Sequence, residues 1–224
     1  MPRIARIIAA QSPHHITQRG NNRADVFFDD QDRVFYMETL GNYCRQWDID
    51  VWAYCLMTNH VHILAVPADQ ESLSRCIGGT NLVYTQHINR KYRRSGRLWQ
   101  NRFHSTVIET ESYLWIVARY IEQNPVKAKL VSNPEDYKWS SCVSNISGKG
   151  NELVDGHGWL DEKERESYTT FLLQQDIEVD NKIRRATATG RPLGSEEFIA
   201  QLEIQLLRKL FPGKAGRPKK MKDN

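Results

Sequence analysis

Two apolar segments joined by a short turn constrain the fold of this 224-residue chain more than any other feature. The first covers 51–57 and contains no charged residue, which is typical of a strand buried on both faces. The second covers 60–66 and follows directly after Thr58-Asn59, so the pair predicts an antiparallel hairpin. Because helical patterns precede and follow this hairpin, we expect an α+β fold built on an antiparallel sheet with flanking helices.

Hydrophobic periodicity and turn residues predict the remaining elements of this part of the chain. Strands are expected over 4–18 and 104–108, and helices over 30–47, 70–92 and 111–124, the last of them stopped by Pro125. In the first of these helices the buried side is expected to carry Val34, Met37, Leu40 and Tyr43.

A glycine-rich link near residue 147 marks a change in the character of the chain. Beyond it the patterns predict helices over 161–173, 176–187 and 195–211. Ser195 before two glutamates is a helix start signal, and the apolar residues Phe198, Ile199, Leu202, Leu206 and Leu210 are expected in the core. We therefore divide the chain into an α+β domain over 1–147, a mostly helical region over 148–212 and a flexible basic tail over 213–224.

Basic residues are concentrated in one segment, although the formal net charge of the whole chain is only +4. Residues 75–108 contain seven basic residues and no acidic one, and the aromatic residues Tyr84, Tyr92, Trp99 and Phe103 lie among them. Guanidinium groups bind phosphates and aromatic rings stack on bases, so this composition suits single-stranded nucleic acid. A solvated helix and loop is the alternative interpretation.

The last residues of the chain repeat the basic pattern. Their Gly-Arg-Pro tripeptide is similar to the minor-groove AT-hook, and a solubilising tail is the alternative. No apolar run approaches the ~18–20 residues that span a bilayer, and the first residues do not form a signal peptide, so we expect a cytoplasmic protein. The four cysteines include no CxxC pair, which argues against a zinc ribbon or a disulfide framework.

His60 and His62 are separated by one residue in the second strand of the hairpin. Alternation places both on one face, about 7 Å apart along the backbone, so the two imidazoles can converge on one metal ion. Neutral imidazole is a common ligand of Mn²⁺, Zn²⁺ and related ions. The histidine-triad nucleotide hydrolases need a third histidine at the next alternate position, where this chain has Leu64.

Tyr120 and Asn124 lie one turn apart on the helix expected over 111–124, on the flank of its apolar stripe. A tyrosine hydroxyl and an amide oxygen in this arrangement would supply a nucleophile and a third metal ligand. The alternative is a boundary tyrosine that packs its ring and exposes its hydroxyl.

Together these residues resemble the single-tyrosine HUH transposases and, within them, the REP-associated tyrosine transposases. The similar segments run through most of the chain and cover 16–22, 26–28, 56–62, 98–103, 119–126, 137–141 and 190–195. Thr58 departs from the family, which usually has proline there, and Lys127 and Lys129 replace an arginine and a glycine. None of these three departures touches the expected chemistry.

The resemblance implies that 1–147 is an HUH/ferredoxin-like catalytic domain that cleaves and rejoins single-stranded DNA near hairpins. It implies Tyr120 as the nucleophile and Mg²⁺ or Mn²⁺ held by His60, His62 and Asn124. DNA contacts are expected from Arg19, Asn21, Arg90, Lys91, Arg93, Arg94, Arg97, Arg102, Arg217, Lys219 and Lys220. Single-stranded DNA hairpins are the expected partner, with no membrane and no nucleotide cofactor, and a monomer is favoured over a homodimer.

Two other functions fit parts of the sequence. A non-catalytic regulator that binds hairpin DNA would keep the fold and its basic surfaces, whereas a plasmid relaxase or rolling-circle initiator shares only the His-Val-His chemistry. His14, His15 and His104 either approach the site or are ordinary surface or sheet histidines. The group that activates Tyr120 is open, since Arg119 beside it points away on a helix.

Overall fold

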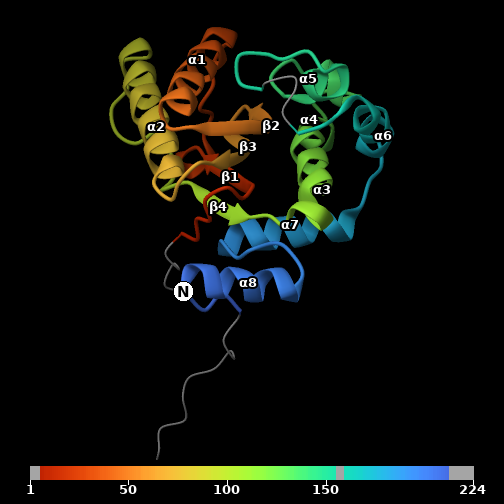
Figure 1. Ribbon diagram of the computed structural model, residues 1–224. Coiled ribbons are helices and arrows are strands. Elements are labelled where there is room, and N and C mark those ends of the chain that lie inside the picture. Colours follow the sequence, from red (N-terminus) through yellow and green to blue (C-terminus); the bar gives the residue numbers. More distant parts are fainter. Residues whose placement is uncertain (1–5, 155–158, 212–224) are drawn as a thin grey trace, which may run out of the picture.

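The computed structural model describes residues 6–154 and 159–211 (Figure 1). Its centre is a four-stranded antiparallel sheet with the strand order β2-β3-β1-β4. The strands are β1 (His14–Arg19), β2 (Ile49–Met57), β3 (His60–Pro67) and β4 (His104–Val107). The predicted hairpin is confirmed as β2 and β3, which pair Met57 with His60 across their turn.

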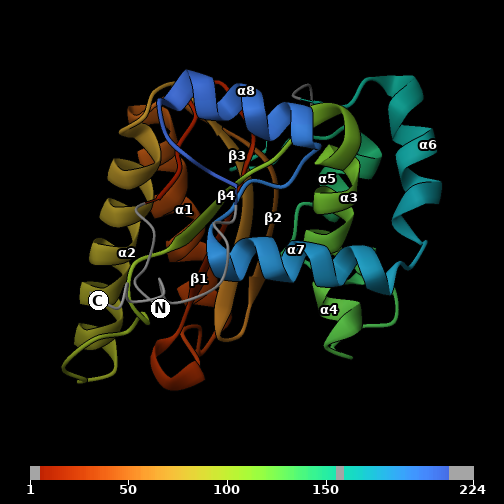
Figure 2. The same ribbon diagram turned by 90° about the horizontal axis from the view of Figure 1, so that it is seen from below.

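Helices cover both faces of this sheet (Figures 1 and 2). On one face lie α1 (Asp30–Gln46) and α2 (Ser72–Lys91), which pack against each other. The opposite side carries α3 (Thr110–Glu122), α4 (Asn124–Lys127), α5 (Cys142–Ser147), α6 (Glu162–Leu172) and α7 (Ile177–Thr189). The helix α8 (Glu196–Leu206) follows α7, and two short 3-10 helices cover Asn21–Arg23 and Pro134–Asp136.

The two faces of β3 enter two different hydrophobic cores. Val61 and Ile63 pack in the core shared with α1 and α2, whereas Leu64 packs in the core shared with α3. Because side chains alternate along a strand, His60 and His62 face the second side, toward α3. Helices α5, α6 and α7 contribute to this same core, and α7 packs against β1 and β4 (Figure 2).

Most of the predicted elements are confirmed, with corrections at three ends. The first strand begins at His14, and no strand covers residues 6–13. The helix before Pro125 ends at Glu122, and Pro125 does not stop it but lies in the first turn of α4, where a missing N–H costs little. The last helix ends at Leu206 because Leu207 adopts a left-handed φ of 48°.

Two side-chain predictions for helices have different outcomes. In α1, Met37 and Leu40 are buried and Tyr43 is half-buried, but Val34 is 41% exposed and Tyr36 takes the central position instead. All five core residues predicted near α8 pack in one cluster with Ile7 and Val107, although Leu210 lies beyond the end of the helix. Ser195 caps α8 by accepting from the Phe198 amide. Hydrophobic periodicity therefore predicts the buried face of α8 correctly, whereas the buried face that it predicts for α1 is rotated by part of a turn.

Helices on both sides of residue 147 share one core, and the domain boundary at that position stays a prediction. In the described ranges no helix is both long and apolar enough to cross a bilayer. The four cysteines are buried and none forms a disulfide, as the sequence predicts.

His14 should make the stability of the fold sensitive to acid. Its Nε2 accepts from the Ala9 amide at 3.2 Å and its Nδ1 donates to the Ser12 carbonyl at 2.7 Å. Burial lowers the pKa of His14 from 6.5 to about 4, and the bond to Ser12 offsets only part of this effect. Between these two values the unfolded chain binds more protons than the folded one, so the free energy of unfolding should fall as pH falls.

Urea unfolding above and below this pH window tests the effect. His14→Gln cannot titrate, so its loss of unfolding free energy on acidification should be smaller than that of the wild type, by up to about 3 kcal/mol. An equal acid loss in both proteins would contradict the assignment to His14.

Candidate active site

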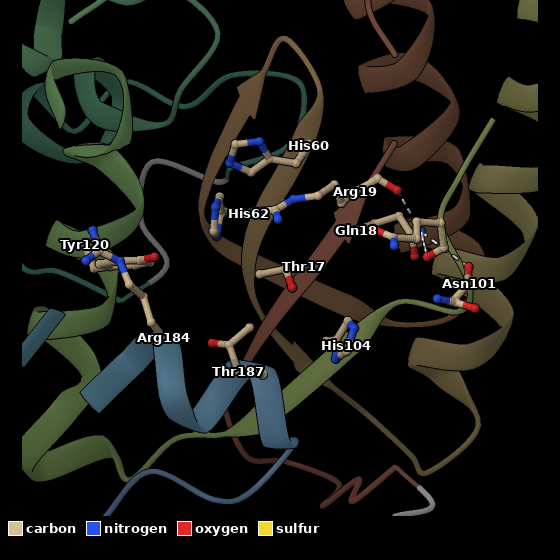
Figure 3. Close-up of a pocket in the computed structure, with 12 residues that line it drawn as sticks. Thr17, Gln18, Arg19, His60, His62, Asn101, His104, Tyr120, Arg184 and Thr187 are labelled. Atoms are coloured by element: carbon tan, nitrogen blue, oxygen red, sulfur yellow. Dashed lines mark hydrogen bonds between the residues drawn. The ribbon is translucent and has the colours of Figure 1, made fainter. Parts of the chain in front are cut away.

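One pocket of about 370 Å³ gathers side chains from β1, β3, β4, α3 and α7 (Figure 3). His60 and His62 come from β3, Arg19 from β1, Tyr120 from α3, and Arg184 and Thr187 from α7. The strand pairing explains part of this arrangement, because Arg19 lies opposite His60 and Thr17 opposite His62. Segments more than a hundred residues apart in the chain therefore meet at one point of the sheet.

The predicted histidine pair and the predicted tyrosine lie together in this pocket. The ring centroids of His60 and His62 are 5.0 Å apart, and the Tyr120 ring lies 5.8 Å from that of His62, edge to face. Tyr120 is 7% exposed and lines the pocket. The arrangement places a phenol beside two imidazoles, as a metal-assisted tyrosine nucleophile requires.

A hydrogen bond to its neighbour orients the ring of His60. Its Nδ1 lies 2.6 Å from Oδ1 of Asn59, whose amide nitrogen donates to the Arg23 carbonyl at 3.0 Å. Because that donation fixes which end of the Asn59 amide is the oxygen, His60 Nδ1 carries the proton and its Nε2 keeps a lone pair. Metal-binding histidines usually have such an outer hydrogen bond.

His15 is a strand residue that contacts His62 directly, although it does not itself line the pocket. Its ring stacks on that of His62 with centroids 5.2 Å apart, and its Nε2 lies 2.9 Å from His62 Nδ1. The pairing of β1 with β3 places His15 and Thr17 on the face of the sheet that carries His62. His104 also lines the pocket, whereas His14 lies apart from it near Ala9.

Burial favours the neutral form of His15, His60 and His62 at physiological pH. Burial lowers the pKa of His60 to about 4 and that of His15 to about 3. Burial also lowers the pKa of His62 well below its usual value, and the neighbouring His15 acts in the same direction. Neutral imidazole is the form that binds metal ions.

Two cations approach Tyr120 from different directions. Burial raises the pKa of the Tyr120 phenol, and the Arg184 guanidinium from α7 acts against this effect. Lys127 lies 4.9 Å from the centre of the Tyr120 ring and pairs with Asp180 at 2.5 Å. Arg119 is buried against Phe171, which confirms that it points away from the site.

Asn124, the predicted third metal ligand, is not among the residues that line the pocket. Its side-chain amide donates to the backbone carbonyls of Tyr120 at 2.8 Å and Ile121 at 3.3 Å. The cause is the helix break at Gln123, after which Asn124 begins α4 and does not continue the face of Tyr120. Its role as a ligand stays a prediction.

The donor set fits a divalent ion held by two nitrogen atoms. In the described part of the chain no hydrogen bond engages Nε2 of His60 or of His62. No third His, Cys, Asp or Glu in the described ranges joins them in a metal-binding group, so further ligands would be oxygens of an amide or hydroxyl side chain, of substrate or of water. Imidazole nitrogen suits Mn²⁺ better than Mg²⁺, which prefers oxygen.

The basic segment over 75–108 exposes its arginines and buries most of its aromatic rings. Arg90, Arg93, Arg94, Arg97 and Arg102 are exposed, as are Arg19 and Asn21 beside the pocket. Lys91 is held by Asp29 at 2.7 Å and Asp32 at 2.8 Å. The predicted DNA contacts Arg217, Lys219 and Lys220 lie outside the described residues.

The stacking role expected for the aromatic residues of this segment is wrong for three of the four. Tyr84, Trp99 and Phe103 are buried in the core beneath α1 and α2, and the Tyr84 hydroxyl donates to the Val26 carbonyl at 2.7 Å. Only Tyr92 is partly accessible, beside the 43% exposed Phe28 with ring centroids 4.7 Å apart. The segment can therefore bind phosphates with its arginines, but it offers few rings to bases.

Comparisons with known proteins show which proteins this chain is similar to. A family model described as "Transposase IS200 like" matches residues 9–124, a range that contains His15, His60, His62 and Tyr120 but not α7. A protein of Haemophilus influenzae named as a REP-associated tyrosine transposase is 28% identical over 117 residues. That match covers 47% of this chain and 66% of the relative, so it spans less than two thirds of the relative's length.

Among solved structures, a REP-associated tyrosine transposase bound to a REP hairpin has a similar fold. The TM-score is 0.58 and the sequence identity 17%, over 73% of this chain and 96% of the other. The similarity confirms the predicted fold class, an antiparallel sheet with flanking helices.

Proposed function

Because the chain belongs to the IS200-like transposase family, we propose that it is a metal-dependent endonuclease and strand transferase for single-stranded DNA. One observation carries the proposal: Tyr120 lies in one pocket with His60 and His62, and no hydrogen bond among the described residues engages Nε2 of either imidazole. The proposed substrates are REP-like hairpins. Support for this choice comes from the fold that the chain shares with a hairpin-bound transposase.

In the proposed reaction the Tyr120 oxygen attacks the phosphorus of a phosphodiester and the bond to the 3′ oxygen breaks. Tyr120 loses its proton to solvent, the departing 3′ oxygen gains one, and a 5′-phosphotyrosine remains on the enzyme. A divalent ion held by the two imidazoles would withdraw charge from a non-bridging phosphate oxygen. Attack by the 3′-hydroxyl of a second strand reverses the step and rejoins DNA, because the phosphotyrosine conserves the phosphodiester.

Arg184 is the group that we assign to the activation of Tyr120. A phenol with a raised pKa is protonated near neutral pH, and a facing guanidinium stabilises the phenolate that forms during attack. The predicted metal ligand Asn124 belongs to this proposal only if its amide turns from the α3 carbonyls toward the pocket.

We place the DNA along the exposed arginines that lead to the pocket. Arg19 and Asn21 lie at the end of β1, next to the site, and Arg90, Arg93, Arg94, Arg97 and Arg102 extend from the end of α2 to β4. Phosphates that replace counterions along this path make binding sensitive to salt.

Replacing Arg93 and Arg94 together with glutamine should reduce the salt dependence of hairpin binding. Each lost phosphate contact lowers the slope of log affinity against log salt by about 0.7 for single strands. Fluorescence anisotropy with a labelled hairpin between about 50 and 200 mM salt measures this slope. Arg75→Gln is the matched control, because Arg75 is exposed on α2 but pairs with Glu71 at 3.3 Å. An unchanged slope in the double variant would remove these arginines from the interface.

A cleavage assay tests the proposed activity. A labelled single-stranded hairpin with flanking sequence, incubated with the protein and Mn²⁺ or Mg²⁺, should yield a free fragment and a protein-linked fragment, and EDTA should stop the reaction. The alternative, a non-catalytic hairpin-binding regulator, predicts salt-sensitive binding of the same oligonucleotides and no cleavage with either metal ion.

A further inference from the structure

We propose that His15 and Thr187 are positioning residues that fix the tautomer of His62, so that its Nε2 presents a lone pair to the pocket. The metal-binding consequence rests on the proposed function, whereas the tautomer is a property of the metal-free protein. Thr187 belongs to α7, outside the residues 9–124 that the family model matches.

The chain of hydrogen bonds begins at Thr187. Its hydroxyl donates to the Ile183 carbonyl at 2.9 Å, one turn earlier in α7. A hydroxyl has one hydrogen, so toward His15 Nδ1, at 3.1 Å, the Thr187 oxygen acts as an acceptor. The proton of the neutral His15 ring is therefore on Nδ1.

The position of the His15 proton in turn decides the position of the His62 proton. With its proton on Nδ1, His15 accepts at Nε2, and the atom that donates to it is His62 Nδ1 at 2.9 Å. The proton of His62 is then on Nδ1, and Nε2 keeps its lone pair. Both histidines are buried, at 1% and 6% exposure, so water does not compete for these bonds.

The direction of the chain decides whether His62 can bind a metal ion. If the Thr187 hydrogen pointed to His15, both rings would take the opposite tautomer and His62 Nε2 would carry a proton. In the proposed chain the Ile183 carbonyl accepts the hydroxyl hydrogen, which leaves the Thr187 oxygen as the acceptor toward His15. His60 receives the equivalent orientation from Asn59 beside it, so the two histidines are oriented from opposite directions.

This arrangement makes α7 part of the site for a specific reason. The helix brings Thr187 to His15 and Arg184 to the pocket with Tyr120, three residues apart on one helix face. The region after residue 147 therefore contributes polar groups to the site as well as apolar packing.

Nitrogen NMR of the metal-free, ¹⁵N-histidine-labelled protein tests the proposal. Wild-type His15 and His62, assigned with single His→Asn variants, should each show a protonated Nδ1 and an unprotonated Nε2. Thr187→Val keeps the shape of the side chain without its hydroxyl, and should give mixed tautomers for both rings. Thr187→Ser keeps the hydroxyl and should retain the wild-type pattern.

Mn²⁺ affinity of the same proteins provides the second readout. Loss of an outer-shell partner typically weakens metal binding by about 10–100-fold, and we expect a loss of this size for Thr187→Val and not for Thr187→Ser. Amide spectra of each variant establish that the fold is intact. A protonated Nε2 on wild-type His62, or unchanged tautomers in Thr187→Val, would overturn the proposal. If the tautomers are as expected but no Mn²⁺ binds, the positioning role stands and the proposed function fails.

Discussion

Replacing Tyr120 with phenylalanine should lower the rate of hairpin cleavage by at least ~10⁴-fold, the scale on which removal of a catalytic nucleophile acts. The ring of Tyr120 is 7% exposed and packs with α3 and the sheet, so the variant keeps these contacts and loses only the hydroxyl. Binding of hairpin DNA should stay within a few-fold of the wild type, because the exposed arginines are unchanged. Single-turnover cleavage and anisotropy measure the two effects separately.

Tyr113→Phe is the matched control for this variant. Tyr113 lies on the same helix and packs partly buried against the same core, but it does not line the pocket. Its loss of a hydroxyl should leave cleavage close to the wild-type rate. Cleavage by Tyr120→Phe at a rate similar to Tyr113→Phe would show that another group is the nucleophile.

Replacing His60 or His62 with glutamine should lower the metal-dependent cleavage rate by about 10²–10⁴-fold, because a bound ion contributes several kcal/mol of charge stabilisation. Each variant should also lose most of its Mn²⁺ affinity, which calorimetry measures without DNA. His87→Gln is the control, since His87 stacks on Phe35 at 3.8 Å among α1 and α2, on the other face of the sheet. Full Mn²⁺ affinity in a protein that lacks both His60 and His62 would exclude this pair as the metal site.

The elements that the sequence predicts well are those with local causes. The β2–β3 hairpin follows from two apolar runs and a two-residue connection, and α1 begins where Asp29 and Asp32 form a capping box. No local pattern predicts where β1 starts. Ile7 and Ala9 are apolar like strand residues, but they pack against α8 and β4 without joining the sheet. Its boundary depends on packing between the two ends of the chain.

The same distinction applies to the candidate site. His60 and His62 can be paired from sequence because alternation along one strand is a local property. Arg184 and Thr187 reach the pocket, and His15 reaches His62, only through the order of the strands and the packing of α7, which no local sequence pattern predicts. Asn124 shows the converse, since the helical spacing from Tyr120 holds only if the helix continues, and it breaks at Gln123.

The buried aromatic residues of the basic segment show that composition alone does not predict whether a side chain faces the core or the solvent. Tyr84 lies seven residues after Ile77 and four before Ile88, so helical periodicity places it on the core face of α2. The exposed arginines of the same segment lie on other faces of α2 or in the loop that follows this helix. Periodicity therefore distinguishes a core tyrosine from a stacking one where the count of aromatic residues does not.

The most direct test of the proposed chemistry is mass spectrometry of the protein after reaction with a hairpin oligonucleotide and Mn²⁺. Trypsin should release residues 120–127 as one peptide, and this peptide should carry the 5′-phosphate end of the cleaved strand on Tyr120. The adduct should be absent with EDTA and in Tyr120→Phe. Cleaved DNA with no protein adduct, or an adduct on a different residue, would contradict the assignment of Tyr120 as the nucleophile.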